Sequence, residues 1–232
     1  MRRGRLGERG GIISFLMWAV VLAVAAGVAG WWFFVRSDAA PPPKLEDANV
    51  VAGGTLDGTW TIRPGQGSFV QYRVKEQFAG AVIETDATGR TDDVTGTMTI
   101  NGSTINGVEV SADLSTLTSD RDRRDRAIRD DGLQSTQFPT STFVLAEPIT
   151  LAEAPRKGVK VTTDATGDFT LHGITKRVTI PLEGRWDGQT VQVVGELPIR
   201  FVDYGITPPN IGGFVTVAGE GKMELQLFFA KG

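Results

Sequence analysis

Two hydrophobic patterns divide this chain into an early apolar segment and a longer region of alternating residues. No charged residue occurs in residues 12–35. As a helix this segment would be about 36 Å long, which exceeds the roughly 30 Å hydrocarbon core of a bilayer. We therefore predict that residues 12–35 form a transmembrane anchor.

The charges on either side of this segment predict its orientation. Arg2, Arg3, Arg5 and Arg9 precede it, and few basic residues follow closely. By the positive-inside rule, residues 1–11 form a cytoplasmic basic tail. The chain would then be a single-pass protein of the cell membrane, with an extracytoplasmic domain after the anchor. A signal peptide cleaved near Ala39-Ala40 is the alternative, although its apolar region is normally about 7–15 residues long.

Residues 36–54 have the composition of a linker. Pro41, Pro42 and Pro43 favour an extended polyproline II conformation, and a polar, glycine-rich stretch follows them. We predict a Pro/Gly linker that holds the next domain a short distance from the membrane.

Residues 55–232 follow a period-2 pattern, which is typical of β-strands. Val70, Tyr72 and Val74 alternate with Gln71 and Arg73. The pattern recurs in residues 98–100, 108–114, 159–161, 178–182, 191–193, 197–201 and 223–229. Asparagine-glycine and aspartate-glycine pairs between these runs indicate tight turns. The region is predicted to be an all-β antiparallel domain of about eight strands, either a sandwich or a barrel.

Residues 119–134 interrupt the alternation and predict one short helix. Ser119 is a suitable N-cap, and acid–base pairs such as Asp120–Arg124 recur at a spacing of four. A catalytic or metal-binding carboxylate cluster is an alternative. We favour a solvated helix face, because each acid has an arginine one turn away.

A four-residue sequence occurs twice, as Asp86-Ala87-Thr88-Gly89 and Asp164-Ala165-Thr166-Gly167. Each copy precedes a predicted strand. We interpret the copies as two similar turns, because four residues do not establish a duplication.

Composition excludes several classes of function. The chain has no cysteine, and His172 is its only histidine, which excludes disulfides, thiol chemistry and zinc sites built on several histidines. The formal net charge of −3 argues against nucleic acid as a partner. We predict no cofactor and no metal.

Four stretches, in the same order, resemble the YceI-like family. They are Gly58-Thr59-Trp60-Thr61-Ile62 followed by Ser68-Phe69-Val70, then Asp113-Leu114-Ser115-Thr116-Leu117 leading to Arg124-Asp125, then Phe138-Pro139-Thr140-Ser141-Thr142-Phe143, and finally Gly167-Asp168-Phe169-Thr170-Leu171-His172-Gly173-Ile174-Thr175-Lys176. Many members carry a histidine where this chain has Ala127, and another soon after the second strand, where this chain has none. A head-group contact made by either histidine would be missing here.

The resemblance implies an extended, lipocalin-like antiparallel β-barrel that is not an enzyme. Its interior would hold an isoprenoid or other lipid ligand. Large side chains of the strand region, together with the single histidine, are the candidate ligand-binding residues: Phe69, Tyr72, Phe78, Phe138, Phe143, Phe169, His172, Trp186 and Phe201. The aromatic residues would equally suit a packed core without a ligand.

Two other functions remain open from the sequence. The first is a non-enzymatic envelope interaction module whose barrel is filled by its own side chains. The second is an enzyme acting on an envelope lipid, which requires His172 to open into a cavity beside a carboxylate. No sequence spacing supports a nucleophile for that enzyme.

Overall fold

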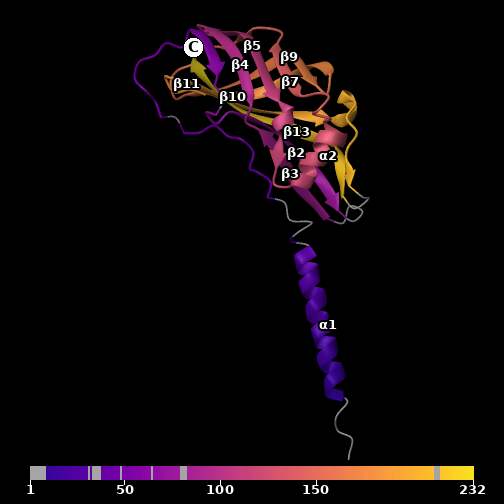
Figure 1. Cartoon of the computed structure of the whole chain (residues 1–232). Helices are drawn as coiled ribbons and strands as arrows, with labels where there is room; N and C mark the ends of the chain where they lie inside the picture. The colour runs from indigo at the N-terminus through magenta and orange to yellow at the C-terminus, as the bar shows by residue number, and fades with distance from the viewer. Residues whose placement is uncertain are drawn as a thin grey trace, which may run out of the picture. The chain divides into compact units, whose positions relative to one another are not determined.

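The chain forms two separate units, Met1–Ser37 and Asp38–Gly232. Our computed structural model describes residues 9–30, 32, 38–47, 49–63, 65–78, 83–211 and 215–232, and Figure 1 shows its elements. The first unit contains one long helix, and the second contains all of the strands.

Helix α1 (Arg9–Gly30) accounts for most of the predicted anchor. Its side chains are exposed from Met17 to Ala29. In the described part of the chain, no helix has both the length and the hydropathy needed to cross a membrane. The structure therefore does not support the predicted transmembrane span. Of the residues in that prediction, 31 and 33–35 lie outside the described part.

The second unit is a closed antiparallel β-barrel, which confirms the all-β domain expected from the alternating pattern and the barrel implied by the family resemblance. Among the described residues, eight strands follow one another round the ring, and the last pairs with the first. In ring order they are β1 (Gly58–Ile62), β4 (Val94–Asn101), β5 (Thr104–Asp113), β7 (Thr140–Leu145), β9 (Lys160–Leu171), β10 (Ile174–Trp186), β11 (Thr190–Arg200) and β13 (Val215–Lys231).

The long strand β13 extends beyond β1 and pairs with a second strand as well. Its last residues pair with β1, and its residues from Val215 to Gln226 pair with β2 (Phe69–Phe78). Strand β2 pairs with β3 (Ile83–Thr91), which in turn pairs with β6 (Thr118–Ser119). Strands β1 and β2 therefore occupy the same place in the ring, one after the other along β13. Strands β4 and β3 share the next place in the same way. Minor elements complete the sheet and its ends: β8 (Ile149–Thr150), β12 (Asn210–Ile211), and the 3-10 turns η2 (Leu114–Thr116) and η4 (Phe201–Tyr204).

The predicted helix is shorter than expected. Helix α2 (Asp122–Ala127) has Arg121 as its N-cap and continues into one wider turn, η3 (Ile128–Gly132). Ser119 belongs to β6, and its hydroxyl donates to Asp125. The predicted Asp120–Arg124 pair is present. Arg124 is buried rather than solvated, however, so the helix does not present a purely solvent-facing set of charges.

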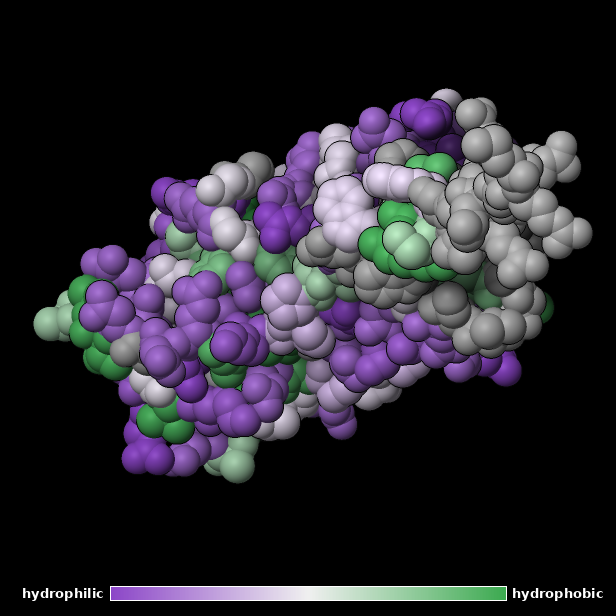
Figure 2. All heavy atoms as spheres, turned by 90° about the horizontal axis from the view of Figure 1, so that it is seen from below, coloured by the Kyte–Doolittle hydropathy of each residue, from purple (hydrophilic) through white to green (hydrophobic). Residues whose placement is uncertain are grey.

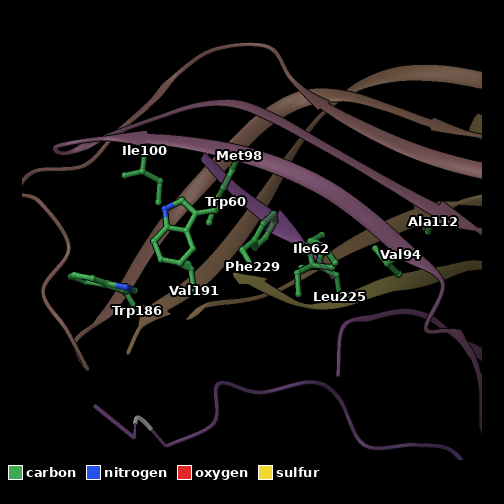
Figure 3. Packing of buried hydrophobic residues seen from close by; sticks show 11 residues of the cluster. Trp60, Ile62, Val94, Met98, Ile100, Ala112, Trp186, Val191, Leu225 and Phe229 are labelled. Atoms are coloured by element: carbon green, nitrogen blue, oxygen red, sulfur yellow. The ribbon is translucent and has the colours of Figure 1, made fainter. Parts of the chain in front are cut away.

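Alternating residues of the strands point into the barrel and form two hydrophobic clusters. The first surrounds Trp60 and Phe229, and Figure 3 shows its side chains converging from strands on several sides. The second surrounds Leu117, Phe169 and Tyr204, nearer helix α2. The period-2 pattern of the sequence thus becomes an apolar interior.

Most of the predicted linker lies along the outside of the barrel and forms hydrogen bonds with it. We call residues 38–54 the strap, of which residue 48 is not described. Residues 36 and 37 of the predicted linker also lie outside the described part. The Ala40 N–H donates to Thr88 Oγ1 at 2.9 Å, and the Val51 N–H donates to the Asp187 carbonyl at 2.8 Å. The strap therefore crosses strands that are far apart in sequence.

Outward-pointing polar side chains hold the strap in place. Gln192 accepts from the Glu46 N–H at 2.8 Å and donates to the Lys44 carbonyl at 3.2 Å. Arg73 donates to the Ala40 carbonyl at 2.6 Å and to Glu224 at 2.7 Å. An extended chain has no internal partners for its N–H and C=O groups, so these bonds satisfy groups that would otherwise need water.

Candidate ligand-binding cavities

The larger cavity lies inside the ring of strands. The centre of a water molecule can occupy about 140 Å³ of it. By that measure a single water needs only about 10–15 Å³, so the cavity has room for several water-sized groups in a row. Its lining is almost entirely apolar, and includes Met98, Val110, Val193, Leu225, Leu227 and Phe229.

The described part of the face in Figure 2 has the opposite character: hydrophilic residues predominate there, and hydrophobic residues lie in small separate groups. Such a surface is ordinary for a protein exposed to water. The continuous apolar lining of the barrel is therefore inside it.

A smaller cavity of about 80 Å³ lies in the half of the barrel nearer helix α2. Tyr72, Leu114, Leu117, Leu133, Phe201 and Ile206 are among its lining residues. Four residues border both cavities: Val70, Ser141, Phe169 and Met223. The two cavities therefore meet at a shared boundary.

A buried ion pair lies at the α2 end of the barrel, beyond the smaller cavity. Arg124 Nε is 2.7 Å from Glu76 Oε1, and Arg124 Nη2 is 2.9 Å from Glu76 Oε2. Both side chains are 6% exposed, and Asp120 also accepts from Arg124. Burial alone would lower the pKa of Arg124, but the hydrogen bonds and charge of Glu76 raise that pKa above its ordinary value. Arg124 therefore stays charged.

Tyr72 lies between this ion pair and the smaller cavity. Burial is the main reason that its pKa lies well above 10.0, and the negative charges of Asp125 and Glu76 add to the shift. The hydroxyl is therefore neutral and keeps its proton. It makes no hydrogen bond of ordinary geometry among the described residues, although the nearby Ser119 side chain partly offsets the rise in its pKa. A neutral donor thus borders the smaller cavity, and Trp186 Nε1, beside the larger cavity, is another buried donor without a partner in the described part of the chain.

Two glycines make room for aromatic residues at these cavities. A Cβ on Gly89 would lie 2.6 Å from Tyr72 Cε1, and one on Gly167 would lie 2.5 Å from Phe143 Cζ. Both glycines end a copy of the repeated four-residue sequence. The copies lie within strands β3 and β9, so their interpretation as turns was wrong. The repeat was the signal in the sequence for these two close approaches.

Five of the nine predicted ligand-binding residues line a cavity. Phe143, Phe169 and Trp186 border the larger one, and Tyr72, Phe169 and Phe201 border the smaller one.

Four predicted residues lie elsewhere. Phe69 packs beneath the guanidinium of Arg90, 4.8 Å from the ring centroid, because its position in β2 faces away from the interior. Phe78 is buried at the far end of β2, and Phe138 packs on His172 with ring centroids 4.3 Å apart. None of these aromatic residues lines either cavity.

His172 lies in the turn between β9 and β10, outside both cavities. Its Nδ1 lies 2.9 Å from the Tyr204 carbonyl oxygen, and its Nε2 lies 3.1 Å from Gln134 Oε1. Both ring nitrogens are thus engaged by neighbouring protein groups. The geometry required by the enzyme hypothesis, a histidine opening into a cavity beside a carboxylate, is not present.

Sequence reasoning missed most of the aliphatic lining, including Met223 and Leu227. Both belong to the alternating run in residues 223–229, but the candidates were all aromatic or histidine. The strand pairings now fix which parity faces inward. Across the described residues, no group of three or more histidine, aspartate or glutamate side chains could hold a metal ion.

Comparisons with known proteins agree with this architecture. The family described as "YceI-like domain" matches residues 60–229. A UPF0312 protein of Pseudomonas putida is 27% identical over 170 residues, which cover 66% of this chain and 85% of that protein. A UPF0312 protein of Pseudomonas aeruginosa is 26% identical over 172 residues, covering 70% of this chain and 83% of that protein.

Two solved structures have the same fold. One is a polyisoprenoid binding domain from Saccharophagus degradans implicated in plant cell wall breakdown. Its TM-score is 0.60 at 17% identity, and the match covers 76% of this chain and 99% of that one. The other is BcnA of Burkholderia cenocepacia, with a TM-score of 0.53 at 17% identity, covering 72% of this chain and 98% of that one.

Proposed function

The chain belongs to the YceI-like family, and we propose that its barrel binds an amphiphilic lipid with a polyisoprenoid or similar chain. The observation that carries this proposal is the apolar cavity inside the ring of strands. Each methylene group buried there contributes about 0.8 kcal/mol. A long hydrocarbon chain therefore binds even after ordering costs of several kcal/mol.

The description of a relative supports an isoprenoid as the hydrocarbon part of the ligand. The Saccharophagus domain is described as polyisoprenoid binding, and it has the same fold. An isoprenoid chain is slender and branched by single methyl groups. Such a shape suits an eight-stranded barrel, whose interior is just wide enough for one small ligand.

The polar end of the barrel supports an amphiphile rather than a plain hydrocarbon. The hydroxyl of Tyr72 and the buried Glu76–Arg124 pair lie on the α2 side of the smaller cavity. A head group with a hydrogen-bond acceptor would satisfy the Tyr72 donor. The residues proposed to hold the chain are Tyr72, Phe143, Phe169, Trp186 and Phe201.

The role we propose is binding without catalysis. Both ring nitrogens of His172 contact protein groups, and neither cavity includes it. The rival interaction module needs an interior filled by its own side chains. The unfilled space bordered by Val193 and Leu227 favours the lipid carrier over that rival.

Attachment to the cell membrane and an extracytoplasmic location are also proposals. They rest on the uncharged residues 12–35 and the arginines before them. Membrane fractionation with alkaline extraction tests them: the full chain should stay with the membrane, and a chain without residues 1–37 should be released. Release of both would reject the anchor.

Mass spectrometry of bound lipid tests the proposed function. The full chain, purified from its own host, is extracted with organic solvent, and the extract is searched for isoprenoid quinones and polyprenyl phosphates. We expect one isoprenoid species at a fixed ratio to protein. Val193→Trp fills the larger cavity, and the bound lipid should fall at least about tenfold.

The matched control places the same side chain on the outside of the barrel. Val144 on β7 is exposed, so Val144→Trp should retain the lipid. Circular dichroism checks that both variants keep their strands. A bare protein that stays bare after incubation with quinones and polyprenyl phosphates would support the interaction module instead.

A further inference from the structure

A waist crosses the barrel where the two cavities meet. The four residues that border both cavities come from opposite walls. Ser141 and Phe169 lie on the neighbouring strands β7 and β9, whereas Met223 and Val70 lie on the neighbouring strands β13 and β2. In the closed ring, these two pairs of strands face each other across the interior. A chain passing from one cavity to the other must pass between them.

Three of the four waist residues are held in place. Phe169 is 3% exposed, and its ring packs edge-on against Tyr204 with centroids 5.8 Å apart. The Ser141 hydroxyl donates to the Thr170 carbonyl at 2.9 Å. Val70 is branched at Cβ, which restricts its χ1 angle. Moving any of these side chains out of the waist therefore costs free energy.

Met223 is the adjustable member of the waist. It is only partly buried, and it packs against both hydrophobic clusters. Methionine is unbranched and has three rotatable bonds, so it changes rotamer at low cost and fits irregular space. A movement of Met223 therefore changes the opening between the two cavities without disturbing the strands.

We propose that Met223 is a gate that sets the length of the hydrocarbon chain the barrel accepts. The proposal rests on the lipid-binding function proposed above. With its head group at Tyr72, a short isoprenoid chain fills the smaller cavity and ends at Met223. A longer chain turns Met223 aside and continues into the larger cavity. Both cavities then hold one continuous chain.

A competition between chains of different length tests the gate. The full-length protein is incubated with an equimolar mixture of all-trans isoprenoid alcohols, from farnesol to long polyprenols. The alcohols that it retains are quantified by mass spectrometry. We expect Met223→Ala to raise the ratio of long to short alcohols about tenfold, because it opens the waist. Met223→Phe should lower the ratio about tenfold, because a bulkier, stiffer ring closes it.

Met98 provides a matched control. It lies on β4 next to Trp60 (Figure 3), borders only the larger cavity, and is also a methionine. Met98→Ala adds similar room away from the waist, so it should leave the ratio of long to short alcohols unchanged. Met223→Leu has nearly the volume of methionine and should restore the wild-type ratio.

Three outcomes separate this proposal from the proposed function. If the wild-type chain retains none of the alcohols, the lipid-binding function fails and the gate fails with it. If the wild type binds alcohols but Met223→Ala and Met98→Ala change the ratio equally, the gate alone is wrong. If Met223→Ala does not fold, the ratio in Met223→Phe decides, and an unchanged ratio there rejects the gate.

Discussion

The two ends of the barrel interior differ in chemistry, although the same alternating pattern builds both. Around Trp60 and Phe229 the buried cluster is wholly hydrophobic. Toward helix α2, the smaller cavity is followed by Tyr72 and the buried Glu76–Arg124 pair. Strand β2 shows the change within one face, because Val70, Tyr72 and Glu76 share its inward parity.

This difference fits the proposed binding of an amphiphile, whose head group would lie at the α2 end. At the Trp60 end the indole N–H of Trp60 donates to the Leu56 carbonyl at 2.8 Å, and the indole N–H of Trp186 has no partner among the described residues. At the α2 end, charged and hydroxyl groups are already buried and can exchange hydrogen bonds with a head group. The chemistry of the interior thus gives a bound lipid a preferred direction.

Breaking the Glu76–Arg124 pair should have the largest effect on stability. Arg124→Ala leaves the Glu76 carboxylate buried without its partner, which should lower the free energy of unfolding by about 3–5 kcal/mol. Urea unfolding followed by tryptophan fluorescence measures the loss. Replacing both residues, as Glu76→Leu with Arg124→Met, should restore most of it, because no charge then remains unpaired.

An exposed ion pair is the control for this experiment. Arg177 Nε lies 2.9 Å from Asp168 Oδ1, and both side chains are about half exposed. Arg177→Ala should cost less than about 1 kcal/mol, because water screens the pair. Equal losses in the free energy of unfolding for Arg124→Ala and Arg177→Ala would contradict the expected difference between the buried and the exposed ion pair.

At the apolar end, a smaller loss is expected from shortening a cavity-lining side chain. Leu227→Ala should lower the free energy of unfolding by about 3 kcal/mol, through lost burial and an enlarged cavity. The same urea titration measures it. Val159→Ala, at an exposed position, should stay within about 0.5 kcal/mol of the wild type. A similar loss at both positions would mean that the interior around Leu227 is loosely packed.

The alternating pattern was sufficient to predict an antiparallel all-β domain, because period 2 assigns each strand an inner and an outer face. The resemblance to the YceI-like family then favoured a barrel over a sandwich. The pattern did not say which parity faces inward. Phe69 was therefore chosen together with Tyr72, although the two lie on opposite faces of β2. The candidate residues were aromatic or histidine, so they did not include Met223, whose importance comes from its place between the two cavities.

The sequence patterns could not predict contacts between segments that lie far apart in the chain. The spacing of four residues predicted the contact between Asp120 and Arg124, but Glu76 lies on strand β2 and is far from Arg124 in the sequence. The contacts of the strap with the barrel could not be predicted for the same reason. Three prolines predict an extended conformation, but only the folded barrel brings Gln192 to Lys44 and Glu46.

Acid titration should give the smallest effect, through Asp120 at the α2 end. Burial opposes ionisation of this carboxyl, but the N–H of Asp38 and the charge of Arg124 outweigh it, so its pKa lies below the ordinary 3.8. The unfolded chain therefore binds the proton first as the pH falls. The stabilisation by Asp120 is fully present above that ordinary pKa, and it is lost as the pH falls through the lowered pKa of the folded state.

Asp120→Asn isolates this contribution from the titration of other carboxylates. The variant should be less stable than the wild type by less than about 1 kcal/mol near neutral pH, because Asp120 is partly exposed. The difference should shrink as the pH falls below 3.8, since protonation removes the same charge from the wild type. Urea unfolding of both proteins at several acidic pH values measures the gap. A gap that stayed constant would show that the Asp120 charge adds nothing, and that Glu76 alone balances Arg124 at this end.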